Sequence, residues 1–286
     1  MILFAFRAEW FKAVRRPAIW VTIGLLLLLA VGVFYVVIYL VATHTTARVR
    51  LQGTDLASLR AGLYPGALVK KALGQANGLD GIFALILGVL LQGSEYGWQT
   101  VKTSNIQLPG RLTVLAGRLA SLALLVLIMV LALFAVDALA SYVIALVDGK
   151  STTFPAPGDI LRAVAAALLI LGFWAAFGVA LATLFRQSAM AIGLGLAYGL
   201  VIETLVFGLL GGLGDVVTQV HVWFPIANGT YLLQAFGADS GNGGGAVAAV
   251  PTTPEADATH AVLVLLAYVL GLVILSGALT RRRDVL

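Results

Sequence analysis

Few residues of this chain have the types and spacing that catalysis needs. The stretch Asp148–Thr152, DGKST, matches the end of a phosphate-binding loop. The complete pattern also needs a preceding strand and a glycine five residues before Gly149, where Ile144 stands. We therefore predict that the chain does not bind ATP through this motif.

Histidine and cysteine offer no metal centre or nucleophile. His44, His221 and His260 are far apart in the sequence, and no zinc-hydrolase or serine-nucleophile motif surrounds them. The chain has no cysteine, which excludes disulfides and Cys-based metal or redox sites. We predict a protein that is not an enzyme and that holds no metal or cofactor of its own.

Two acidic residues stand inside apolar stretches. Glu203 lies some 15 residues into the stretch 188–210, roughly 22 Å deep at 1.5 Å per residue. Asp137 lies near the end of the stretch 115–146, and Arg162 lies near the start of the next one. Charge at membrane depth is costly unless it is paired or hydrated. Glu203 and Asp137 therefore either belong to a polar cluster that holds helices together or line a pathway.

The segment Gly93–Arg118, which we call the elbow, is polar where a membrane span should end. Its polar and turn-forming residues are Glu95, Gly97, Thr100, Lys102, Pro109, Arg111 and Arg118. Pro109 is favourable in the first turn of a new helix, and Arg111 and Arg118, seven apart, fall near one helix face. A basic surface fixed to two spans could transmit force from a soluble partner. An ordinary hairpin with interfacial charges is the alternative.

The composition identifies the medium in which these residues work. The chain is 60% hydrophobic and 11% charged, with a mean hydropathy of +1.01, whereas soluble domains have about 25% charged residues. This is the composition of an all-α polytopic membrane protein. The sequence pI is about 9.6, but the basic residues flank apolar stretches, which is a membrane-topology pattern and not a nucleic-acid-binding one.

The apolar stretches predict one transmembrane domain over residues 1–286. A bilayer core of about 30 Å needs roughly 20 helical residues, and six spans are expected at about 18–42, 72–94, 115–146, 160–184, 188–210 and 260–280. The second is hardest to place, because only 14 uncharged residues separate Asp80 from Glu95. Its helix must extend past one acid or both. In the fifth span, Gly195-x-x-x-Gly199 permits close helix contact.

Lysine and arginine predict the orientation. Eleven of the 18 lie in the two terminal segments, the elbow and the turn at Arg186. We expect the protein in the inner (cytoplasmic) membrane of the cell. The positive-inside rule then predicts that both termini and the elbow, which joins spans 2 and 3, face the cytoplasm.

Residues 1–17 are too few to span and predict an amphipathic interfacial helix. Ile2, Leu3, Phe4, Phe6, Trp10, Phe11 and Val14 share one arc, whereas Glu9, Lys12, Arg15 and Arg16 share the opposite arc. The alternative is a plain basic flank of the first span. Near the other end of the chain, the aromatic segment 215–236 should lie in the outer interface or dip into it.

In its order of residues the elbow resembles the conserved cytoplasmic loop of ABC type-2 exporter permeases. The pattern is E-x-G-x-x-T-x-K, then L-P-x-R, then R, although Trp98-Gln99 separates a Gly and a Thr that are more often contiguous in the family. The segments FRAEWFKAVRRP, WFPIANGTYLL and RRRDVL also resemble that family. The likeness in layout covers nearly the whole chain.

The resemblance implies the transmembrane subunit of an ATP-driven exporter, which forms the translocation path in the lipid membrane. Two copies of a separate ATP-binding subunit, holding ATP and Mg, would dock on the elbow. A second permease copy, or a related permease, would complete the dimer. The alternatives are an ion-coupled secondary transporter that uses Glu203 and Asp137, for which the sequence lacks the expected repeats, and a non-transporting scaffold or sensor.

Overall fold

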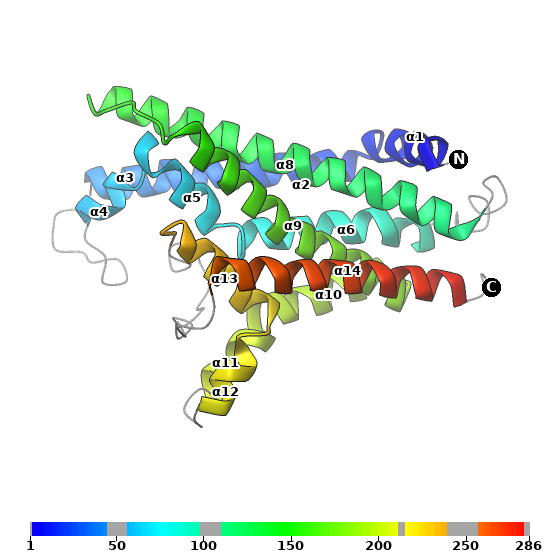
Figure 1. Cartoon of the computed structure of the whole chain (residues 1–286). Coiled ribbons are helices and arrows are strands. Elements are labelled where there is room, and N and C mark those ends of the chain that lie inside the picture. Colours follow the sequence, from blue (N-terminus) through cyan, green and yellow to red (C-terminus); the bar gives the residue numbers. More distant parts are fainter. Residues whose placement is uncertain (1, 45–55, 98–109, 211–214, 239–256, 283–286) are drawn as a thin grey trace.

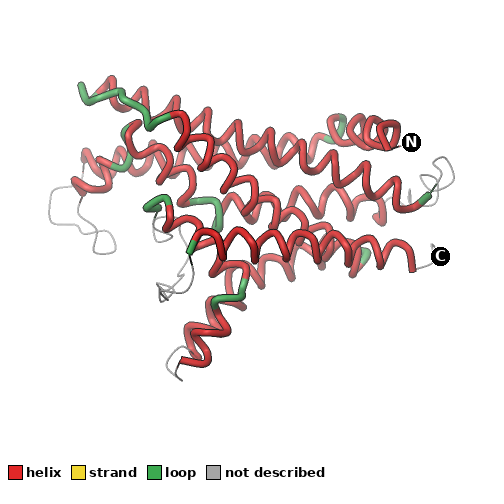
Figure 2. Tube along the Cα trace, viewed as in Figure 1, coloured by secondary structure: helices red, strands yellow, loops and turns green. Residues whose placement is uncertain are grey.

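The computed structural model describes residues 2–44, 56–97, 110–210, 215–238 and 257–282 (Figure 1). Within these ranges the regular elements are all helical and run mostly along one axis (Figure 2). They are α1 (Ile2–Val14), α2 (Pro17–Val31), η1 (Gly32–Val37), α3 (Ile38–His44), α4 (Leu56–Ala61), η2 (Pro65–Ala67), α5 (Leu68–Gly74), α6 (Leu79–Gly97), α8 (Arg111–Val147), α9 (Pro157–Phe185), α10 (Ser188–Ala197), η3 (Tyr198–Ile202), α11 (Glu203–Leu210), α12 (Asp215–His221), α13 (Pro225–Ala235) and α14 (Ala258–Arg282).

Five of the described helical segments are long and apolar enough to cross a membrane. They are Pro17–His44, Leu112–Val147, Pro157–Phe185, Ser188–Phe207 and Ala258–Arg282. A sixth span is present if Pro65–Gly74 and Leu79–Ser94, which meet at a bend of 52°, are counted as one. The prediction of an all-α polytopic membrane protein is confirmed.

The second span, expected over 72–94, is broken by a turn, although its helix α6 extends past both Asp80 and Glu95, as expected. Helix α5 ends at Gly74, and α6 starts at Leu79 after a four-residue turn. Glycine and asparagine favour turns over helix interiors, and Asp80 stands in the first turn of α6, where an acid is favourable. The side chain of Asn77 binds another helix, because its Nδ2 donates to the carbonyl oxygen of Ile226 at 2.8 Å.

Helix α8 starts before the span expected at 115–146. Its first described residue is Arg111 and its N-cap is Gly110. Gly110 has φ of 106°, a left-handed conformation that glycine adopts without steric cost.

The centre of the bundle is the crossing of α6 and α9. A Cβ at Gly88 would clash with the carbonyl oxygen of Ala175, and one at Gly178 would clash with the carbonyl oxygen of Leu85. The two backbones therefore touch, each through a glycine of its own. Helix α10 adds to this pair through Gly195, where a Cβ would lie 2.5 Å from Leu85. Helix contact through Gly195 agrees with its expected role in the fifth span.

Helix α13, from the aromatic segment expected at the outer interface, lies deep in the protein. Its residues Pro225–Leu233 are all buried, and it contacts α14, α5 and α9. The α13 part of the segment therefore dips into the bundle, whereas Val220 and Trp223 before it are 48% and 61% exposed. Its small residues make this possible, because a Cβ at Gly229 would lie 2.6 Å from Asn77.

At the end of the bundle opposite the two termini, a clasp joins the first span to α8 (Figure 1). We define the clasp as Asp148, Arg60, Tyr39 and Tyr64. Arg60 donates to both carboxylate oxygens of Asp148, at 2.7 and 3.0 Å. The hydroxyls of Tyr39 and Tyr64 donate to the same carboxylate, at 3.0 and 2.9 Å. The Asp148 side chain is only 4% exposed.

The crossing predicts a large steric cost at Gly88. Gly88→Val should lower the free energy of unfolding by about 1–3 kcal/mol, because its side chain must displace the backbone of α9. The control is Gly172→Val on α9, where a Cβ meets nothing within 4 Å. Unfolding in mixed detergent, followed by tryptophan fluorescence, measures both. Equal losses in the two variants would show that the backbones are not in contact.

The clasp predicts an acid-dependent stability. Hydrogen bonds from Arg60 first, and then from Tyr64 and Tyr39, lower the pKa of Asp148 to about 2, below its ordinary value of about 3.9. A lowered pKa in the folded state stabilises the protein above about pH 4, and this contribution is lost as the pH falls towards 2. The difference in melting temperature between wild type and Asp148→Asn should therefore shrink over that window. The same series with Asp159→Asn, at an exposed carboxylate, should show no such trend, and a constant Asp148→Asn difference would refute the clasp.

Candidate functional site at the base of the elbow

The elbow emerges from the end of the bundle that carries both termini. Helix α6 ends at Gly97 and α8 begins at Arg111, and α1 lies at this same end (Figure 1). Helix α1 packs mainly on α8. Three elements that are distant in sequence therefore meet where the elbow is attached.

Arg118 is the centre of this meeting point. Its Nε donates to Glu9 Oε2 at 3.1 Å, and its Nη1 donates to Gln92 Oε1 at 2.7 Å. The other oxygen of Glu9 accepts from Lys12 Nζ at 2.8 Å. The side chains of Arg118 and Glu9 are 8% and 3% exposed. One guanidinium thus links α8 to α1 and to the end of α6.

A second bond ties α1 to α6. Arg16, just after α1, donates through Nη1 to the hydroxyl of Ser94, which itself donates to the carbonyl oxygen of Leu90. Ser94 directly precedes Glu95 in the last turns of α6. We call Glu9, Arg16, Gln92, Ser94 and Arg118 the base of the elbow.

Small residues let α1 reach this position. A Cβ at Gly117 would lie 2.6 Å from the backbone of Ala5, so α1 and α8 are in backbone contact. Ala5, Glu9 and Ala13 are spaced four apart and all buried, and residues at this spacing share one helix face. Glu9 belongs to the predicted polar arc, but that arc packs partly on protein, because Arg118 binds Glu9 and Ser94 binds Arg16.

The apolar arc of α1 faces outward. Leu3, Phe4 and Phe11 are 66%, 70% and 57% exposed, as expected of a helix that rests in a membrane interface. Trp10 is partly buried and stacks on Phe6. Arg15 is exposed, and its guanidinium lies 4.1 Å from the centre of the Phe11 ring.

The structure locates four of the seven predicted elbow residues. Arg118 lies at the base, Glu95 and Gly97 lie in the last turn of α6, and Arg111 is the first residue of α8. The remaining three, Thr100, Lys102 and Pro109, lie outside the described residues. Their contribution to a docking surface stays a prediction.

The carboxylate of Glu203 binds the start of a buried helix. It accepts backbone N–H bonds from Ala227 at 2.9 Å and Ile226 at 3.3 Å, in the first turn of α13. Tyr198 donates its hydroxyl to the same carboxylate at 2.6 Å. Residues five apart would point about 140° apart on an α-helix, but π-helical η3 lies between these two. The acid at membrane depth thus caps a buried helix.

Asp137 belongs to another site. It is buried on α8 and interacts electrostatically with Lys71, Asp80 and Tyr35. Arg162 pairs instead with Asp159, at 3.9 Å on the exposed start of α9. Glu203 and Asp137 therefore share no described partner, and the described residues contain no group of three His, Asp or Glu side chains that could hold a metal ion.

The comparison with protein families shows the family of this membrane protein. Residues 4–285 match the model described as "ABC-2 family transporter protein". The chain belongs to the ABC-2 transporter family. A search of curated proteins gave no match. Family membership confirms the resemblance read from the elbow and establishes a transmembrane subunit of an ABC transporter.

Sequence reasoning missed Glu9, Gln92 and Asn77 as structural residues of this ABC-2 protein. Glu9 has the spacing of an exposed polar arc, and its burial depends on a partner more than one hundred positions away. Gln92 and Asn77 did carry a signal, because an amide between apolar residues needs a hydrogen-bond partner in the membrane. Sequence alone does not show which helix supplies it.

We expect Arg118 and Glu9, in the base of the elbow, to contribute to the free energy of unfolding as a coupled pair. Arg118→Met should lower the free energy of unfolding by about 3–5 kcal/mol, because it leaves the Glu9 carboxylate buried without its main cation. Adding Glu9→Leu should recover part of that loss, so the double variant loses less than the sum of the single variants. Unfolding of the purified variants in detergent measures all three.

The matched control is Arg162→Met, because its pair with Asp159 is 78% and 58% exposed. Exposed pairs contribute about 0–1 kcal/mol, so this variant should resemble wild type. Strictly additive losses for Arg118→Met and Glu9→Leu would contradict the buried pair.

Proposed function

We propose that this ABC-2 protein is an exporter subunit that forms the translocation path and receives force from a separate ATP-binding subunit at the elbow. The observation that carries the proposal is the pair of hydrogen bonds by which Arg118, on α8, binds Glu9 of α1 and Gln92 of α6. A docking surface transmits force only if the helices that carry it are held rigidly. The base of the elbow holds α6 and α8, the helices on both sides of the elbow, against each other and against α1.

The supports also connect the elbow to the membrane interface. Helix α1 exposes its apolar arc and is bonded to both helices that carry the elbow. A force on α6 and α8 would therefore move a helix that rests against lipid headgroups. This arrangement favours a concerted movement of the three elements over independent flexing of a hairpin.

The proposed assembly has two ATP-binding subunits beneath two permeases. ATP and Mg would bind in the partner subunits, and both termini with the elbow would face the cytoplasm of the inner membrane. Apolar side chains of α14 such as Leu263, Leu270 and Ile274 are 60–69% exposed. Such a face supports contact with lipid or with a second permease copy.

The ion-coupled alternative finds less support. It needs Glu203 and Asp137 to act together, but Glu203 caps α13, and Asp137 faces Lys71, Asp80 and Tyr35. A scaffold or sensor would have no need of an ATP-binding partner. Docking of that partner is therefore the decisive measurement.

Charge reversal tests the docking surface. Lys102→Glu and Arg111→Glu should each weaken co-purification of the ATP-binding subunit by about tenfold or more, because like charges across an interface cost several kcal/mol. Glu95→Ala should keep some docking but reduce the transport-linked ATPase turnover. The complexes are purified from cells that express both subunits, and bound ATPase and turnover are measured.

Lys150→Glu is the matched control, because Lys150 is exposed and follows α8 at the opposite end of the bundle. It should keep full docking and turnover. Wild-type behaviour of all three elbow variants would show that the elbow is a plain hairpin and would refute the proposal.

A further inference from the structure

Titratable side chains from four elements gather at the break in the second span, the turn 75–78 between α5 and α6. Lys71 belongs to the last turn of α5, before the break, and Asp80 belongs to the first turn of α6, after it. Asp137 of α8 interacts electrostatically with Lys71, with Asp80 and with Tyr35 of η1. Among the described residues, no other charged group acts on the two carboxylates. We call these four residues the break cluster.

The two acids of the break cluster lack the partners that other buried acids of this protein have. Asp80 and Asp137 are 3% and 6% exposed, yet within the described ranges neither side chain makes a hydrogen bond or an ion pair. The carboxylates of Glu9, Asp148 and Glu203 are also buried, and each accepts at least two hydrogen bonds. A charge at membrane depth is costly without a partner. The break cluster therefore needs another way to remove the cost of its buried charge.

Two further polar atoms at the break are buried without a partner. They are the hydroxyl of Tyr35 and Oε1 of Gln75, neither of which has a hydrogen bond among the described residues. Gln75 is next to the acids, because its carbonyl oxygen accepts from the backbone N–H of Asp80 at 3.2 Å. An amide oxygen can only accept, and a Tyr oxygen can accept as well as donate. A protonated carboxyl carries an O–H donor, whereas a carboxylate carries none. Protonation of one acid therefore supplies the kind of group that these atoms lack.

The charges of the break cluster do not balance when every group is ionised. Two carboxylates then accompany one ammonium, which leaves a net negative charge inside the protein. Lys71 attracts Asp137, whereas the charge that acts on Asp80 is the like charge of Asp137. Two carboxylates in one buried site do not readily ionise together, and one proton shared between them removes the imbalance. Lys71 then balances the carboxylate that stays ionised.

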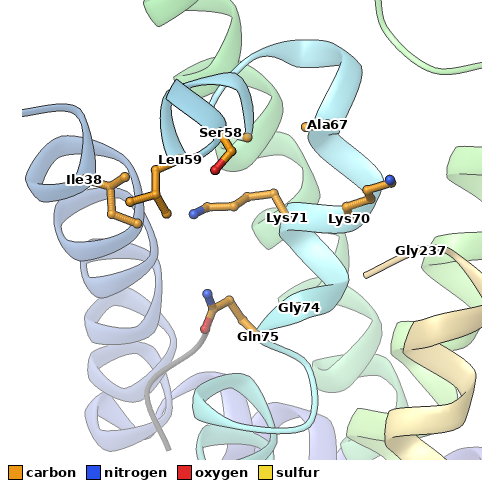
Figure 3. Close-up of a pocket in the computed structure, with 10 residues that line it drawn as sticks. Ile38, Ser58, Leu59, Ala67, Lys70, Lys71, Gly74, Gln75 and Gly237 are labelled. Atoms are coloured by element: carbon orange, nitrogen blue, oxygen red, sulfur yellow. The ribbon is translucent and has the colours of Figure 1, made fainter. Parts of the chain in front are cut away.

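A pocket brings water as far as the break cluster. Lys71 extends across this pocket towards Leu59, and the side chain of Gln75 lies below its ammonium (Figure 3). The cavity volume is about 160 Å³, whereas one water molecule needs only about 10–15 Å³. Several waters therefore fit beside Lys71 and Gln75, and they give protons a hydrated route from the end of the bundle opposite the termini.

We propose that Asp80 and Asp137 form a buried proton-binding site, which holds one proton between them at neutral pH. The proton belongs to the pair and not to one residue, because the two acids interact. Lys71 balances the second carboxylate, so that α5, α6 and α8 meet at the break without net charge in the membrane. The site requires neither Glu203 nor the elbow, and its test is therefore independent of the ATP-coupling proposal.

Infrared spectroscopy of the full-length protein in detergent at neutral pH tests the site, because a protonated carboxyl and a carboxylate absorb at different frequencies. Wild type should show the carbonyl band of a protonated carboxyl, and Asp80→Asn should lose this band, because Asp137 then ionises opposite Lys71. Lys71→Gln should increase the band about twofold, since both acids must then be neutral in the interior. Lys70→Gln is the matched control, because it removes the same charge from an adjacent, exposed residue, and it should leave the band unchanged.

A second variant keeps the test open if Asp80→Asn does not fold. Asp137→Asn should also lose the band, because Asp80 then ionises opposite Lys71. A wild-type spectrum without a protonated-carboxyl band that depends on these acids overturns the proposal. Equal bands in Lys71→Gln and Lys70→Gln also overturn it, because the charge of Lys71 would then not determine how many protons the pair holds.

Discussion

The close approach of α6 and α9 is the constraint on which the rest of the structure depends. In lipid, burial of apolar surface does not drive helices together, so association depends on packing and on polar contacts. Gly88 and Gly178 let each backbone reach the other, which gives this pair more contact than any other two elements. Trp174 fills the space beside the crossing and lies against Gly81 and Gly199. The positions of α10 and of the α5–α6 turn follow from that packing.

Polar side chains then fix the elements that the crossing does not reach. Glu203 accepts hydrogen bonds from the first turn of α13, and Asn77 donates to the carbonyl oxygen of Ile226 in the same helix. Arg118 donates to α1 and to α6. Each of these groups would be costly in hydrocarbon if it had no partner. Because the membrane offers no water to replace a lost partner, each bond selects one arrangement of the helices. The same residues that raise the cost of membrane insertion therefore specify the fold.

The membrane spans and the apolar and polar faces of the helices can be predicted from the sequence, but the helix that each face contacts cannot. Hydropathy depends on local composition, so the apolar stretches and the amphipathic α1 could be predicted. The break at Gln75–Gly78 could not be placed, because an apolar window averages over a four-residue turn. Burial of Glu9 and of α13 depends on contacts with residues far along the chain, Arg118 and Asn77. Pairing of Glu203 with Tyr198 depends on a π-helical segment, which hydrophobic periodicity does not show.

Helix α8 connects the two ends of the molecule. Its 37 residues span about 55 Å at 1.5 Å per residue, well beyond a hydrocarbon core of about 30 Å. Arg118 lies seven residues, about two turns, after the first residue of α8, and Asp148 is the C-cap at the other end. The helix is uninterrupted between them, so a displacement at the base of the elbow moves the clasp as well. The first span is bonded to α8 at the clasp through Tyr39, and it follows α1, which is bonded to α8 at the base. If a partner displaces the elbow as proposed, these bonds would carry the first span and α8 together.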